Sequence, residues 1–88
     1  MAEAEERAAA LRAEAASIAE KLRREGQERA DSLETRGTGL ARIAAKAAAD
    51  RLRKETDSKA DAIVREAESR AQALLAEARK QADLIKRE

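Results

Sequence analysis

The segments ADRLRKETDSK (49–59), ADAIVREAESR (60–70) and AQALLAEARKQ (71–81), followed by the partial segment ADLIKRE (82–88), repeat one pattern every eleven residues. Alanine occupies the first position of each segment, and leucine or isoleucine occupies the fourth. These positions hold Ala49, Ala60, Ala71 and Ala82, and Leu52, Ile63, Leu74 and Ile85. A pattern kept in register over this many segments predicts one repetitive helical element.

The N-terminal half keeps the same frame less regularly. Segments 8–18, 19–29 and 30–40 place Leu11, Leu22 and Leu33 in the fourth position. Between the halves the frame slips, because Ala30 and Ala49 are nineteen residues apart rather than twenty-two. Both halves are therefore expected to be helical, with an irregularity between them.

The period of the repeat predicts how the helices associate. Eleven residues in three turns give about 3.67 residues per turn, which favours a right-handed supercoil. Positions one, four, five and eight form one stripe along such a helix, with small residues at its flanks. We expect an all-α fold of long helices in a right-handed hendecad coiled coil or helix bundle.

The composition indicates that these helices need partners. Of the 38 apolar residues among the 88 in the chain, 24 are alanine and none is aromatic. Fourteen larger apolar side chains are too few to fill a compact core for a single chain of this size. We therefore expect a homo-oligomer of two to four helices, or a dimer of helical hairpins.

Several classes of function are not expected from this sequence. The chain has no Cys or His, and no glycine-rich phosphate loop, so we expect no enzyme, cofactor or metal site. A net charge of +1 and the absence of aromatic residues argue against nucleic-acid binding. No apolar run is long enough to span a bilayer, and the lack of Cys and of a signal peptide favours a cytoplasmic location.

Gly37-Thr38-Gly39 is the one irregular stretch of the sequence. Gly37 suits a left-handed C-cap, and Thr38 could N-cap a second helix. The chain is then one coiled-coil segment, 1–88, with a helix at 2–36, a break at 37–39 with Gly37 and Gly39 as the hinge, and a helix at 40–88. The alternative is a single continuous helix about 130 Å long, since the apolar stripe continues through the glycines.

A hairpin would leave part of its second helix uncovered. Residues 3–36 would cover about 40–73, so that Leu74, Leu75, Leu84 and Ile85 extend beyond the partner helix, which favours a dimer of hairpins. The residues expected at the oligomer interface are Leu11, Leu22, Leu33, Ala49, Leu52, Ala60, Ile63, Val64, Ala67, Ala71, Leu74, Leu75, Ala78, Ala82 and Ile85.

The run ADAIVREAESRAQALLAEARKQADLI resembles the right-handed hendecad coiled coils of bacterial and archaeal stalk proteins, especially the peripheral-stalk subunits of rotary ATPases. The resemblance covers residues 49–88 well and 8–36 loosely, and it is a likeness of repeat rather than of a functional motif. It implies a mechanical role, as a stiff and elongated connector. The glycines at 37 and 39 depart from it, because they would weaken a stalk at its middle.

Two other classes of protein use eleven-residue periods and are the alternatives to a structural coiled coil. Conditionally disordered protectants of the late-embryogenesis-abundant type have a similar composition, but they lack doublets such as Ile63-Val64 and Leu74-Leu75. Amphipathic membrane-surface helices usually place aromatic residues at the interface, and this chain has none. Membrane binding is therefore not expected, and a repeat this regular is also compatible with a designed sequence.

Overall fold

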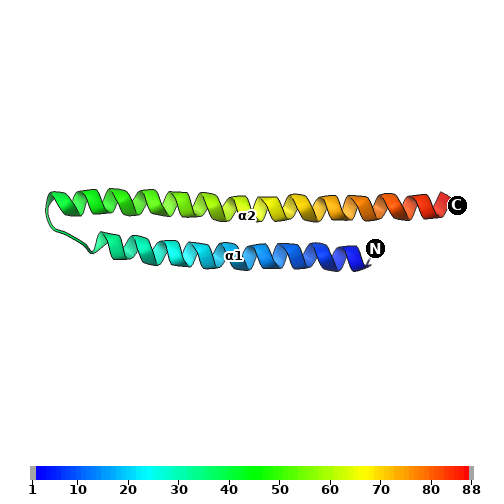
Figure 1. Ribbon diagram of the computed structural model, residues 1–88, viewed down its shortest axis with the longest axis horizontal. Helices are drawn as coiled ribbons and strands as arrows, with labels where there is room; N and C mark the ends of the chain where they lie inside the picture. Colours follow the sequence, from blue (N-terminus) through cyan, green and yellow to red (C-terminus); the bar gives the residue numbers. More distant parts are fainter. Residues whose placement is uncertain (1, 88) are drawn as a thin grey trace.

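The computed structural model describes residues 2–87 and shows an antiparallel helical hairpin. Helix α1 (Ala2–Glu34) and helix α2 (Leu40–Arg87) run side by side and are joined by a short connection (Figure 1). The Cα atoms extend over 75 × 15 × 6 Å, so the molecule is long and flat. The all-α prediction is confirmed, and of the two arrangements open to the sequence the chain adopts the hairpin.

Both glycines of the connection adopt backbone conformations that other residues rarely take. The φ angles of Gly37 and Gly39 are 81° and 60°, in the left-handed region. Helix α1 ends just before them, with the N–H of Arg36 donating to the carbonyl of Leu33 at 3.2 Å. The left-handed backbone expected of Gly37 is therefore present, although α1 ends at Glu34 rather than at residue 36.

The start of α2 differs from the expected cap. The carbonyl of Gly39 accepts from the N–H of Arg42 at 3.1 Å and from the N–H of Ile43 at 3.3 Å. Accepting the first helical hydrogen bonds makes Gly39 the N-cap residue. The prediction that Thr38 holds this position was wrong by one residue, because the chain turns into the helix only after the second left-handed glycine.

The two helices meet along a seam of small residues. In α1 the buried residues are Ala8, Ala15, Ala19, Gly26 and Ala30, and in α2 they are Ala49, Thr56, Ala60, Ala67 and Ala71. In both helices the spacing alternates between seven and four residues. No large side chain is fully buried in the described part of the chain. This small-residue seam lets the two backbones approach closely, and it leaves the larger apolar side chains at its edges.

The register of the seam leaves α2 uncovered at both ends. Gly26 faces Thr56, so Glu34 lies level with residue 48 rather than with residue 40. Leu40 is 85% exposed beyond one end of α1, and Ile85 is 72% exposed towards the other. The overhang of α2 near the connection is visible in Figure 1.

This offset corrects the expected overlap. Leu74 and Leu75 do not extend freely beyond α1, because the whole of α1 is shifted towards the C-terminal end of α2. Both side chains are half-buried, and Leu74 lines a groove with Arg7 and Leu11 of α1. Leu84 and Ile85 are exposed, as the expected overhang requires.

The contact between Gly26 and Thr56 generates a test of the seam. A Cβ atom added at Gly26 would lie 2.5 Å from Cγ2 and 2.6 Å from Oγ1 of Thr56. We expect Gly26→Ala to destabilise the hairpin by about 1–3 kcal/mol through overpacking, although alanine favours a helix interior by about 1 kcal/mol over glycine. Adding Thr56→Ala removes the clash, so the double variant should recover at least the stability lost by Gly26→Ala.

The measurement is urea unfolding of the wild type, both single variants and the double variant at one protein concentration, analysed as a double-mutant cycle. Strictly additive effects of the two substitutions would show that these residues do not meet.

Candidate interaction surfaces

The predicted interface alanines of α2 lie inside the hairpin. Ala49, Ala60 and Ala71 are 0% exposed and Ala67 is 7% exposed, all in the small-residue seam. They therefore pack against α1 of the same chain. The sequence placed them correctly on a buried stripe, but within the described residues the helix that buries them belongs to the same molecule.

The larger predicted residues occupy the borders of the seam. The half-buried ones are Leu11, Leu22, Leu33, Leu52, Ile63, Leu74 and Leu75, whereas Val64 and Ile85 are exposed. Ala78 and Ala82 continue the spacing of the seam and are half-buried. Gly37 and Gly39, the predicted hinge residues, lie in the connection between the helices. The structure thus brings most of the predicted residues close to the contact between α1 and α2, but at two different depths.

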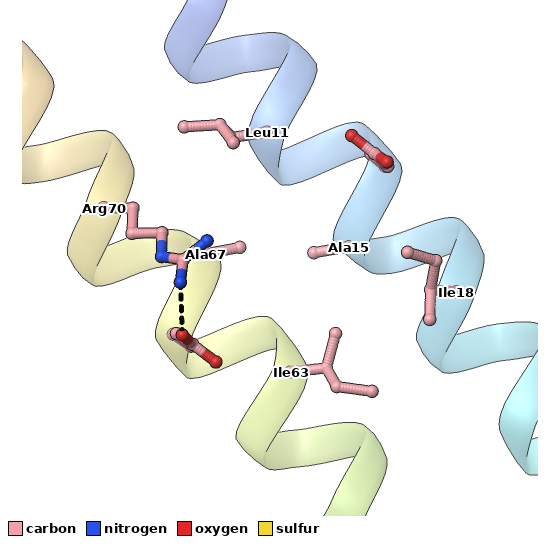
Figure 2. Close-up of a pocket in the computed structure, with 8 residues that line it drawn as sticks. Leu11, Ala15, Ile18, Ile63, Ala67 and Arg70 are labelled. Carbon is pink, nitrogen blue, oxygen red and sulfur yellow. Dashed lines mark hydrogen bonds and ion pairs between the residues drawn. The ribbon is translucent and has the colours of Figure 1, made fainter.

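One broad side of the hairpin carries apolar grooves, and we call it the apolar face. It is defined by Leu11, Ile18, Leu22, Leu33, Leu52, Ile63 and Leu74. In the central groove, Leu11, Ala15 and Ile18 of α1 stand opposite Ile63 and Ala67 of α2 (Figure 2). The steps of four and three residues along each helix place these side chains on one surface.

Further grooves continue the apolar face towards both ends. Near the connection, Leu33 and Leu52 line a groove together with Arg29 and Arg36. Towards the free ends, Leu74 and Ile85 of α2 line another with Ala4 of α1. The apolar face therefore follows the hairpin over most of its length.

Three arginines form ion pairs between the helices. Arg12 donates to both carboxylate oxygens of Glu68, through Nε at 2.7 Å and Nη2 at 2.9 Å. Arg23 contacts Asp61 at 2.6 Å and Asp57 at 3.6 Å. Because paired charges recur along the contact, they specify its register as well as its antiparallel direction.

The third arginine, Arg53, is the centre of a cluster near the connection. It donates to Glu34 at 2.6 Å and to Asp31 at 3.0 Å across the helices, and to Asp50 at 3.1 Å within α2. Its side chain is only 26% exposed, and it also donates to Gln27 at 3.3 Å. This cluster fastens the end of α1 to α2 just before the chain turns.

These ion pairs lie on the side opposite the leucines, which we call the charged face; it is defined by Arg12, Arg23, Asp31, Glu34, Arg53, Asp57, Asp61 and Glu68. Each of the three arginines directly follows a leucine of the apolar face, as in Leu22-Arg23 and Leu52-Arg53. Consecutive residues point about 100° apart around a helix. The small-residue seam therefore has leucines along one border and ion pairs along the other.

The fifth position of the repeat carries a sequence signal for these pairs. In the N-terminal segments the fifth position of the repeat holds Arg12, Arg23 and Glu34, whereas two of the C-terminal segments hold Val64 and Leu75 there. The charged residues at this position of the predicted apolar stripe, which include Arg53 in the C-terminal helix, point to ion pairs along one border. Their partners could not be identified before the register was known.

The ion pairs change the pKa values of their members. The hydrogen bond from Arg53 lowers the pKa of Glu34, and the hydrogen bond from Arg12 lowers the pKa of Glu68, in both cases against the opposing effect of desolvation. The same hydrogen bonds raise the pKa of Arg12 and of Arg53. All four groups remain accessible to solvent, so water and salt screen these interactions and their contribution to stability is modest.

Metal sites and membrane-spanning helices are both absent from the described residues. No group of three or more acidic side chains there is arranged to hold a metal ion. Neither described helix has a segment apolar enough and long enough to cross a bilayer.

The lowered pKa values of Glu34 and Glu68 predict an acid-sensitive hairpin. Ionised carboxylates that are stabilised in the folded state contribute stability above their unfolded pKa, and this contribution is lost as the pH falls through the lower folded pKa. We expect the melting temperature to fall when the pH is lowered from about 7 to about 3. In Glu34→Gln/Glu68→Gln, the melting temperature at neutral pH should be lower and its fall on acidification smaller.

Glu28→Gln is the matched control, because Glu28 is an exposed carboxylate for which no ion pair is found in the described part of the chain. Thermal unfolding followed by circular dichroism at a fixed protein concentration makes the measurement. Identical acid sensitivity in the double variant and the wild type would contradict the assignment.

Comparisons with known proteins add no family to this description. No protein-family model, curated protein or solved structure matches the chain. The surfaces of the hairpin itself are therefore the basis for a proposal about its function.

Proposed function

We propose that this chain is a structural element, an elongated helical hairpin that self-associates and serves as a connector or stalk segment. The observation that carries the proposal is the lack of any fully buried large side chain among the described residues. The proposal is thus based on the shape and packing of the hairpin rather than on an arrangement of catalytic residues.

The packing of a single hairpin explains why association is favoured. Its seam consists almost entirely of alanine, which has high helix propensity but contributes little apolar area. Burial of a leucine or isoleucine contributes about 1.5–3 kcal/mol when it is complete. The leucines of the apolar face are only half-buried in one hairpin, so a large part of this free energy is available to a complex.

The shape supports a mechanical role. Two helices packed along most of a 75 Å length resist bending better than one helix, and the ion pairs oppose sliding of one helix along the other. The glycines that would weaken a continuous stalk lie at the end of this rod rather than at its middle. The eleven-residue repeat and its likeness to stalk proteins support the same role, with the right-handed supercoil as part of the proposal.

Sedimentation equilibrium over a wide concentration range, with far-UV circular dichroism on the same samples, tests the proposal. We expect a helical dimer of hairpins whose melting temperature rises with protein concentration, because dissociation accompanies unfolding. A monomer with little helix would contradict self-association and favour a protectant. Helix formation only on anionic vesicles would instead favour a membrane-surface helix.

A further inference from the structure

Resting on the proposed self-association, we propose that a second copy of this chain covers the apolar face, and that the small-residue seam and the charged face stay within each hairpin. The resulting assembly is a bundle of four helices with the leucines of both copies at its centre. This assigns the oligomer contact to Leu11, Ile18, Leu22, Leu52, Ile63 and Leu74 rather than to the predicted alanines.

The seam is already occupied within one chain. Ala49, Ala60 and Ala71 have no exposed surface left to offer a partner, because α1 covers them. A partner that used these alanines would first have to separate the two helices and break the ion pairs of Arg12, Arg23 and Arg53. Contact between intact hairpins must therefore use surface outside the seam, and the two broad faces are the longest such surfaces, since the uncovered ends of α2 are short.

The two faces differ in what a partner would have to desolvate. On the charged face, a partner would remove water from carboxylates and guanidinium groups that are already paired with each other, which carries a desolvation cost. On the apolar face it would cover leucine and isoleucine, including Ile18, which is 47% exposed. Apolar burial therefore selects the apolar face.

The size of the apolar face suits a stable dimer. The part of the hairpin in which two helices lie side by side is as long as α1, about 50 Å, and 15 Å wide between Cα atoms, so one broad side covers about 750 Å² even without the side chains that extend beyond the Cα atoms. Stable protein interfaces bury about 800 Å² on each partner. A partner of equal length that covers the whole of this side is thus of the required size, and a second hairpin has this length and shape.

The charges around the grooves favour a second copy over a partner with charge of one sign. The central groove is bordered by Glu14, Glu66 and Arg70, with Arg70 held at 2.7 Å from Glu66. The groove towards the free ends has Glu3, Arg7 and Glu77 at its border. Acidic and basic groups are mixed at these two grooves, whereas Arg29 and Arg36 border the groove near the connection. A partner with the same rim can place opposite charges together, whereas a polyanion would meet carboxylates over the central groove.

Two substitutions at exposed residues of similar size distinguish the faces. Ile18 lies in the central groove of the apolar face, whereas Val64 is 41% exposed and stands between Asp61 and Glu68 on the charged face. Neither side chain is buried in the hairpin, so Ile18→Asp and Val64→Asp should both leave the helix content unchanged. We expect Ile18→Asp to weaken dimerisation at least about tenfold, because it places a charge in the contact, and Val64→Asp to leave it unchanged.

Sedimentation equilibrium of both variants gives the dissociation constants, and circular dichroism reports the helix content. Because the chain has no cysteine, single Ile18→Cys and Val64→Cys variants can also carry a polarity-sensitive fluorophore. Emission from the label at residue 18 should shift to longer wavelength on dilution, whereas emission from residue 64 should not. If the helix content of Ile18→Asp is reduced, this second measurement decides which face lies in the dimer contact.

The outcomes separate this inference from the proposed function. A dimer that is weakened by Val64→Asp, or by neither substitution, overturns the assignment to the apolar face while self-association stands. A wild-type chain that is helical and monomeric at every concentration overturns both.

Discussion

The close approach of two helical backbones along the small-residue seam is the constraint on which the rest of the structure depends. Each seam position faces the other helix directly, so its side chain must be small. Thr56 is the one larger residue in the seam, and glycine rather than alanine stands opposite it at position 26. The seam therefore specifies which residues face each other, but its alanines bury little apolar area.

This constraint determines where the larger side chains lie. With the centre of the contact reserved for alanine, leucines and arginines are displaced to opposite borders of the seam. The arginines form ion pairs with carboxylates on the other helix, whereas the leucines are only half-buried by it. In a single hairpin the charges of the charged face are thus paired, whereas the apolar face stays partly exposed to water. This difference is the physical basis for proposing a structural, self-associating protein.

The sequence predicted the helices, the break at the glycines and the left-handed backbone of Gly37, because these depend on local preferences and on periodicity. It did not predict the overlap of the helices, which depends on how residues 35–39 cross between them. The ion pairs of Arg12 and Arg53 depend on the same register. A periodic stripe also shows that Ala60 and Ala71 are buried without showing which helix buries them, so it does not distinguish a partner chain from the other helix of the same chain.

The difference between the two faces changes along the hairpin. Near the connection, Arg53 forms ion pairs with acidic groups of both helices, so the charged face there is strongly polar. Beyond the pair of Arg12 and Glu68, the fifth position of the repeat holds the half-buried Leu75 in place of a charged residue. The preference of a partner for the apolar face therefore depends on the part of the hairpin between the connection and the Arg12–Glu68 pair. A partner that bound the charged face there would have to desolvate the most charge.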